Sequence, residues 1–378
     1  MLEPQRSIYR EFNPSRLKAA RIAKGLKQTE VAREFGFSRQ FMHQCESGAR
    51  TPNSDSISAF CELLNVNNEY FFKPSLIDLS LDDFNFRKQR TTTKSVAEQI
   101  KAKAMLLSEM VDWINRFVDL PPPNFPEISV RTDKDIELAA KISRQRWDLG
   151  ESSPISNVVR VAERAGALVI NTIGVNEKIS ALSVSARRPL ILHNKVMNQP
   201  TRLRFNLAHE LGHFVMHTGI QTGDHFTETE ANNFAGAFLL PKKAFMQDFP
   251  SKNRIDWNTV FDLKKKWGVS AQAIIRRSFN LGIISASQYK SASIYISKNG
   301  WRKTEPHENW NLEEAELLES ALKLIQNHFK LDIKDLCHDL GITEQFFSEL
   351  TGIAPSPTSA GNGKVVSLGK HRNFRRIS

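Results

Sequence analysis

The stretch that decides the fold is Arg204-Phe205-Asn206-Leu207-Ala208-His209-Glu210-Leu211-Gly212-His213. His209 and His213 are four residues apart, so on a helix they lie one turn apart on the same face. Two imidazoles at that spacing can bind one tetrahedral metal ion, and Glu210 lies beside them within reach of a metal-bound water. The pattern therefore predicts a zinc-binding helix in which Glu210 is the general base of a peptidase.

The residues around the histidine pair are typical of a buried active-site helix. An apolar face is formed by Phe205, Ala208, Leu211 and Val215. Gly212 would let another backbone approach the helix closely, at a cost of roughly 1 kcal/mol in helix propensity. The alternative is a surface helix with two unrelated histidines, which the apolar face disfavours.

A catalytic zinc ion usually has a third protein ligand, and the next helical segment offers two carboxylates. Glu228 shares a face with Asn232, which lies one turn away and could orient a ligand. Glu230 faces elsewhere and forms with Thr227 the pattern of a capping box, which is a structural role. We therefore predict Glu228 as the third ligand and keep Glu230 as the alternative.

Three further histidines lie near this motif in the sequence or in the expected cleft. His217, one turn beyond His213, is interpreted as a cation favoured by the dipole at the helix C-terminus. His193 and His225 are expected in solvated surface positions, although either could steady an oxyanion.

A second constellation of residues lies near the N-terminus. Residues 28–35 are expected to form a helix, Gly36 a tight turn, and residues 38–46 a second helix capped by Ser38. Arginine pairs with guanine edges and glutamine with adenine edges in the major groove. A recognition helix presents such groups near its N-terminus, and the second helix carries Arg39, Gln40, His43 and Gln44 outward.

These motifs carry two resemblances to known families. Residues 204–213, the pattern from Glu228 to Ala235, Leu239-Leu240-Pro241, Trp267 to Ser270 and Leu281 to Ile284 together resemble the ImmA/IrrE family of metallopeptidases. The resemblance covers roughly residues 130 to 310 and implies a compact zincin-like fold, a Zn²⁺ cofactor and cleavage of a repressor or other regulatory protein. The family's metal ligands map onto His209, His213 and Glu228, with Glu210 as the general base.

The N-terminal segment from Arg16 to Pro52 resembles the Cro/repressor (XRE) type of helix-turn-helix. That resemblance implies double-stranded DNA as a partner, at an operator-like site. The implied DNA contacts are Gln28, Ser38, Arg39, Gln40 and Gln44. The alternative is a helix-turn-helix domain that makes only protein contacts.

The pattern along the chain predicts a multidomain, mainly α protein. An all-α helix-turn-helix domain is expected at 14–73, then a linker and a long helix at 74–127, with an exposed polar stretch at 78–93. Residues 128–305 are expected to form an α+β zincin-like metallopeptidase domain with a small sheet. Paired strands are predicted at 179–185 and 190–193.

The last third of the chain reads as mostly helical. A helical C-terminal region is predicted at 306–353, in which Glu313, Glu314, Glu316 and Glu319 would form a solvated acidic face. The Ser-, Gly- and Pro-rich segment 354–378, which ends in several arginines, is expected to be a disordered basic tail.

The composition indicates the cellular environment of the chain and the class of partner it binds. The 378 residues contain 52 Lys and Arg against 41 Asp and Glu, a net charge of +11, which weakly favours a nucleic-acid partner. The basic residues outside the N-terminal segment look scattered and are interpreted as a solvated face. Three well-separated cysteines, a polar N-terminus and the absence of any long apolar run predict a cytoplasmic protein with reduced thiols and no membrane contact.

Two functions from different classes are compatible with these motifs. The favoured one is a zinc-dependent endopeptidase that cleaves a protein substrate, a transcriptional repressor, and is coupled to sequence-specific DNA binding. The alternative is a transcription factor whose metal domain senses a ligand or stress without proteolysis, and Glu210 disfavours it because metal binding alone does not require that carboxylate. A third interpretation, a module that acts through protein contacts, predicts no bound metal. A homodimer is left open beside a monomer.

Overall fold

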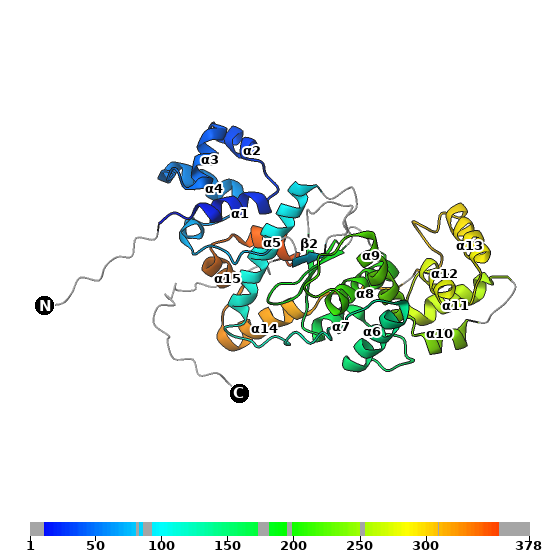
Figure 1. Ribbon diagram of the computed structural model, residues 1–378. Coiled ribbons are helices and arrows are strands. Elements are labelled where there is room, and N and C mark those ends of the chain that lie inside the picture. The colour runs from blue at the N-terminus through cyan, green and yellow to red at the C-terminus, as the bar shows by residue number, and fades with distance from the viewer. Residues whose placement is uncertain are drawn as a thin grey trace.

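The computed structural model describes residues 11–80, 83–85, 93–172, 181–194, 199–249, 254–308 and 310–354 (Figure 1). The tail that was expected to be disordered lies outside the described residues, except for Ala354. The protein is mostly helical with one small sheet, as the sequence predicted.

The N-terminal helices are short and end at turns that the sequence marks. They are α1 (Pro14–Ala23), α2 (Gln28–Glu34), α3 (Arg39–Ser47), α4 (Ser54–Leu64) and the 3₁₀ helix η1 (Asn68–Phe72). Gly36 has a φ of +69° in the turn between α2 and α3, where a side chain would strain the backbone. The hydroxyl of Ser38 then accepts a hydrogen bond from the amide of Phe41 at 3.0 Å, which confirms Ser38 as the N-cap of α3.

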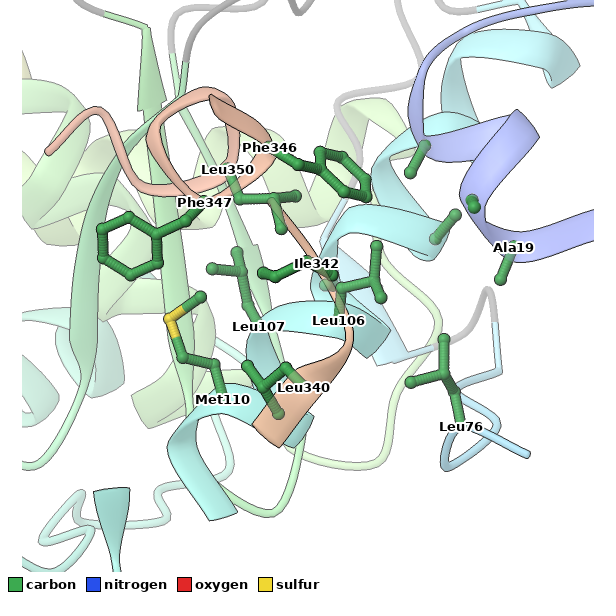
Figure 2. Packing of buried hydrophobic residues seen from close by; sticks show 14 of the residues in the cluster. Ala19, Leu76, Leu106, Leu107, Met110, Leu340, Ile342, Phe346, Phe347 and Leu350 are labelled. Atoms are coloured by element: carbon green, nitrogen blue, oxygen red, sulfur yellow. The ribbon is translucent and has the colours of Figure 1, made fainter. Parts of the chain in front are cut away.

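The long helix α5 (Lys94–Ile114) connects the two ends of the chain. It packs against α1 and against the C-terminal helices α14 (Leu317–Phe329) and α15 (Ile333–Leu340), and α16 (Glu344–Thr351) packs on α15 in the same hydrophobic cluster. Figure 2 shows Leu106, Leu107 and Met110 of α5 facing Leu340 and Ile342. One hydrophobic cluster therefore contains the N-terminal helices, α5 and the C-terminal helices.

The remaining helices surround the histidine motif and extend away from it. They are α6 (Asp133–Arg146), α7 (Val158–Arg164), α8 (Pro200–Met216), α9 (His225–Leu239), α10 (Lys242–Asp248), α11 (Trp257–Trp267), α12 (Ala271–Asn280) and α13 (Ala286–Lys298). Their apolar faces form a second hydrophobic cluster. In Figure 1, α2 and α3 lie at one end of the molecule and α11 to α13 at the other.

The sheet lies between the two clusters. Its strands, in spatial order, are β1 (Phe84–Asn85), β3 (Ala181–Val184), β4 (Leu190–Asn194) and β2 (Leu168–Thr172). The predicted pair β3 and β4 is antiparallel, while β2 and β4 are parallel. Side chains alternate between the faces of a strand, so Leu168 and Ile170 belong to the first cluster and Val169 to the second.

Strand β1 contradicts the prediction of an exposed linker at 78–93. Phe84 and Asn85 pair with Val184 and Ser183, and only 3% and 7% of their surface is exposed. Two paired residues are too few to produce the period-two alternation by which a strand is recognised in a sequence. Because two aspartates precede them and Arg87 and Lys88 follow shortly after, the sequence around them looks like a polar loop.

The prediction of a solvated acidic face is confirmed for Glu314, Glu316 and Glu319, which are exposed, but is wrong for Glu313. Glu313 forms an ion pair with Arg204 of α8 and accepts hydrogen bonds from the amides of Val158 and Val159, at 2.7 and 3.1 Å. A carboxylate at the N-terminus of α7 satisfies amides that the helix itself leaves without partners. The segment therefore ties α7 to α8, and α14 begins only at Leu317.

None of the helices in the described part of the chain combines the length and the apolar character that a membrane span needs.

Helices α8 and α9 are in close contact at Gly212. A Cβ atom at this position would lie 2.9 Å from Cδ1 of Phe234, closer than real Cβ contacts. The sequence predicted close approach of another backbone, but the neighbour is this aromatic side chain. The space above Gly212 is therefore filled by a fixed core ring, which sets the distance between the two helices.

We expect Gly212→Val to lower the free energy of unfolding by about 1–3 kcal/mol, because the added side chain would overpack the contact with Phe234. Urea denaturation with circular dichroism would measure it. Gly236→Ala is the matched control, since its Cβ would meet only Cδ of Arg277, at an ordinary 3.8 Å. In that variant the free energy of unfolding should rise by roughly 0.5–1 kcal/mol, because alanine has a higher helix propensity than glycine. Equal effects of the two substitutions would contradict the packing argument.

Candidate functional site

Three side chains from α8 and α9 converge on one point. The Nε2 atoms of His209 and His213 are 3.1 Å apart, and each lies 3.6 Å from a carboxylate oxygen of Glu228. These ligand atoms all lie within 4.8 Å of one another, and the described residues hold no second such group of three or more. Two imidazole nitrogens and one carboxylate suit Zn²⁺, whose bonds to such atoms are about 2.0–2.2 Å long. The residues present therefore fit the metal that the sequence implied.

Each imidazole is oriented by a contact at its other ring nitrogen. Nδ1 of His209 lies 3.1 Å from Oδ1 of Asn232, and Nδ1 of His213 lies 2.9 Å from Nδ1 of His217. A partner at Nδ1 fixes the ring orientation and directs Nε2 toward a metal. Asn232 thus lies where the sequence suggested an orienting residue.

The protonation of His213 suits metal binding. Burial, with a smaller contribution from the neighbouring His217, lowers the pKa of His213 to about 3. A neutral imidazole is the form that donates a lone pair to a metal. His213 is therefore neutral across the physiological pH range.

Glu230 and His217 form a buried pair, which contradicts two predictions. Nε2 of His217 lies 3.0 Å from Oε2 of Glu230, and the two residues are only 4% and 7% exposed. The cap of α9 is Asp224, whose side chain accepts from the amides of Phe226 and Thr227. The predicted capping box of Thr227 and Glu230 is therefore wrong, and His217 is held by side chains and not by the helix dipole alone.

Glu210 lies at the end of a chain of buried hydrogen bonds. The hydroxyl of Ser183 donates to Oε2 of Glu210 at 2.5 Å, and the side-chain amide of Asn85 donates to Ser183 at 2.9 Å. Thr222 donates in turn to Oδ1 of Asn85 at 2.8 Å. Glu210 itself is 4% exposed. These contacts hold its carboxylate in one position beside the sheet.

The sequence did not identify Ser183, Asn85 or Thr222. The three residues come from three separate segments, and only the fold brings them to Glu210. The one available signal was Ser183 itself, a polar residue inside the otherwise apolar run Ala181-Leu182-Ser183-Val184.

Of the five predicted DNA contacts, three are exposed, one is half-buried and one is hydrogen-bonded to another side chain. Ser38, Arg39 and Gln40 are exposed at the N-terminal end of α3, and Gln44 is half-buried one turn further on. The amide of Gln28 instead donates to Glu46 at 2.8 Å, and Glu46 forms an ion pair with Arg21. The structure thus places four of the five predicted contacts along α3 and ties Gln28 to its C-terminal half.

Two family models match parts of this chain. A helix-turn-helix domain matches residues 15–69, and the IrrE N-terminal-like domain of peptidase family M78 matches residues 162–279. The chain carries a helix-turn-helix domain followed by an IrrE N-terminal-like domain. This order is that of the ImmA/IrrE architecture that the motifs suggested. No curated protein matches the chain.

The IrrE N-terminal-like domain contains the whole cluster of His209, His213 and Glu228, but Asn85 lies outside the matched residues. His193, predicted to be solvated, is buried on β4 with 4% of its surface exposed. A single histidine in a strand carries no signal that separates a buried position from a solvated one. His225 is exposed at the first position of α9, as predicted.

The positive charge of the chain is concentrated away from the helix-turn-helix domain. Residues 14–73 contain nine Lys and Arg against six Asp and Glu, whereas residues 241–304 contain thirteen against three. The basic residues that looked scattered are therefore gathered around α10 to α13. The net charge gives little support to DNA binding by α3, and that support comes from the helix-turn-helix geometry.

We expect Glu230→Ala to lower the free energy of unfolding of the metal-free protein by about 1–3 kcal/mol, because it removes the hydrogen-bond partner of the buried His217. Glu230→Gln keeps an acceptor and should lose clearly less. Chemical denaturation of both variants beside the unaltered protein measures the difference. An Ala variant as stable as the unaltered protein would show that the contact contributes nothing.

Proposed function

We propose that the chain is a zinc-dependent endopeptidase that cleaves a repressor or another regulatory protein, and that its helix-turn-helix domain binds double-stranded DNA. The observation that carries the proposal is the convergence of His209, His213 and Glu228 within a domain of peptidase family M78. We assign the peptidase to residues 128–305 and DNA binding to residues 14–73.

In this proposal His209 and His213 bind the ion through Nε2, and Glu228 binds it through a carboxylate oxygen. Asn232 and His217 orient the two imidazoles through contacts with their Nδ1 atoms. A bound zinc ion would polarise the scissile carbonyl and lower the pKa of a water molecule toward neutrality.

Glu210 has the role that separates a peptidase from a metal sensor. It follows His209 in the chain, so its carboxylate is carried by the helix that carries the metal ligands. As general base it takes a proton from the attacking water and passes it to the leaving amine. The hydrogen bond from Ser183 supports this role because it holds the carboxylate in one place. A sensor would need the three ligands but no fixed carboxylate beside them.

Metal analysis combined with a cleavage assay tests this proposal. We expect about one zinc ion per purified chain, lost in a His213→Ala variant. The protein is then incubated with regulators encoded beside it. Glu210→Gln should keep the metal but lower the cleavage rate by roughly 10²–10⁴-fold, the contribution typical of a general base.

The same variant separates the proposal from its alternatives. Gene regulation that survives Glu210→Gln undiminished in cells would favour the metal-sensing transcription factor. A purified chain that holds no metal and binds none on titration would favour a module that acts only through protein contacts.

The proposed DNA contacts come from the first residue of α2, from the N-cap of α3 and from α3 itself. They are Gln28, Ser38, Arg39, Gln40 and Gln44. Arg39 and Gln40 are exposed and carry the groups that pair with guanine and adenine edges.

We expect Arg39→Ala and Gln40→Ala each to cost about 1–3 kcal/mol of binding to the operator, found by selection from random duplexes. Fluorescence anisotropy at fixed salt measures the loss. Lys18→Ala is the control, since it removes an exposed charge from α1. This control should either weaken binding to the operator and to non-specific DNA by the same factor or leave both unchanged. Unchanged operator binding by the α3 variants would contradict this interface.

A further inference from the structure

Strand β1 lies on the outer edge of the sheet, next to the metal centre. It pairs antiparallel with β3, and β3 in turn contacts α8, the helix that carries His209 and His213. Asn85 is opposite Ser183 in this register, and Ser183 donates directly to Glu210. Strand β1 is therefore separated from Glu210 by a single side chain.

The other edge of the sheet is covered by a different part of the protein. Strand β2 contacts α14 and α16, and a Cβ at Gly352, just after α16, would lie 2.5 Å from the carbonyl oxygen of Asn171. The β1 side of the sheet adjoins the metal centre, because β3 contacts α8 and Ser183 donates to Glu210. A strand that pairs there passes beside Glu210.

A peptide bond is cleaved at its backbone, so a protein substrate has to present an extended segment to the metal. A sheet edge binds such a segment by pairing with its amides and carbonyls. The backbone groups that could do so on the side where β1 pairs are those of Ser183 in β3 and of Ser185 just after it, because backbone groups alternate between the two edges of a strand. A substrate strand and β1 therefore need the same backbone edge.

We propose that β1 is a built-in competitor of the substrate: the outer edge of β3 is the docking edge for an extended segment of the protein substrate, and β1 occupies it until it is displaced. This inference rests on the proposed peptidase function. It adds that the chain as folded is closed to extended peptides although its metal ligands are in place.

The small size of β1 makes displacement feasible. The strand has two paired residues, flanked on its N-terminal side by one further hydrogen bond from the amide of Ser185 to the carbonyl of Asp83, at 2.7 Å. By comparison, β2 and β4 pair over five residues. Phe84, which is 3% exposed, anchors β1 in the first hydrophobic cluster.

The position of β1 in the chain connects it to the DNA-binding end. It lies between η1, the last element of the helix-turn-helix region, and α5, which packs against α1. A change in how the first helices sit on α5 would act on both ends of the segment that holds β1. The competitor is thus placed where DNA binding can influence it.

A reversible covalent lock tests the proposal. Asp83 and Ser185 form a hydrogen-bonded pair, so the adjacent pair of Phe84 and Val184 is a non-hydrogen-bonded one. Such pairs bring Cα atoms to about 4.5 Å, within the range that a disulfide spans. The combined substitutions Phe84→Cys and Val184→Cys should therefore lock β1 to β3 when oxidised and release it when reduced.

Two zinc-binding probes report on the edge and on the metal separately. The full-length, zinc-loaded variant is titrated by calorimetry with a tripeptide hydroxamate, which needs the edge of β3, and with acetohydroxamate, which needs only the metal. We expect oxidation to weaken binding of the tripeptide hydroxamate at least tenfold and to leave acetohydroxamate binding unchanged. The unaltered protein, treated in parallel, controls for its three natural cysteines.

The outcomes separate this inference from the proposed function. If acetohydroxamate does not bind the zinc-loaded protein at all, the metal centre is wrong and the peptidase assignment fails with it. If acetohydroxamate binds but the tripeptide hydroxamate binds equally to the locked and released forms, the metal centre stands and β1 is no competitor.

A single substitution gives a second route if the double variant does not fold. Phe84→Ala loosens β1 and should therefore tighten binding of the tripeptide hydroxamate several-fold. The affinity for acetohydroxamate should not change. Leu76→Ala truncates the same hydrophobic cluster outside the sheet and should leave both affinities unchanged. Equal affinities for Phe84→Ala and the unaltered protein would also overturn the proposal.

Discussion

The contact of α8 with α9 is the constraint on which the candidate metal centre depends. Two candidate ligands come from α8 and the third from α9, so the cluster exists only at one separation and one register of the two helices. Gly212, lying between the ligand histidines, meets the ring of Phe234, and this contact sets the separation. Packing in a protein interior is dense enough that such a contact fixes side chains to within fractions of an ångström. The geometry of the ligands is therefore a result of core packing.

The second requirement is that polar groups around this core find partners. His217 with Glu230, and Ser183 with Asn85, place buried polar groups against one another behind the ligands and behind Glu210. Leaving any of them without a partner in the interior would cost more than the hydrogen bond itself contributes. These pairs fix orientations that packing alone leaves free, such as the rotation of an imidazole about its own axis.

Features with a local cause could be predicted from the sequence. The spacing of His209 and His213, the cap at Ser38 and the pairing of β3 with β4 depend on neighbours in the chain, and the structure has them. The contacts of Glu230, Glu313 and β1 depend on residues far away in the sequence. For Glu230, a local pattern, the capping box, pointed to the wrong partner because Asp224 already satisfies the helix N-terminus. A buried ion pair and a two-residue strand leave no periodic trace, so the sequence read both as solvated.

The packing of the C-terminal helices on α5 has a consequence for the order of synthesis. Residues of α15 and α16 complete the hydrophobic cluster that α1 and α5 begin, and Lys24, directly after α1, pairs with Glu349 at 2.6 Å. During translation, α1 and α5 leave the ribosome long before α15 and α16 do. Until then the growing chain exposes the apolar side of α5, and contacts so distant in sequence form slowly. A premature stop codon before α15 would therefore leave the helix-turn-helix domain and α5 without the apolar partners that complete their cluster.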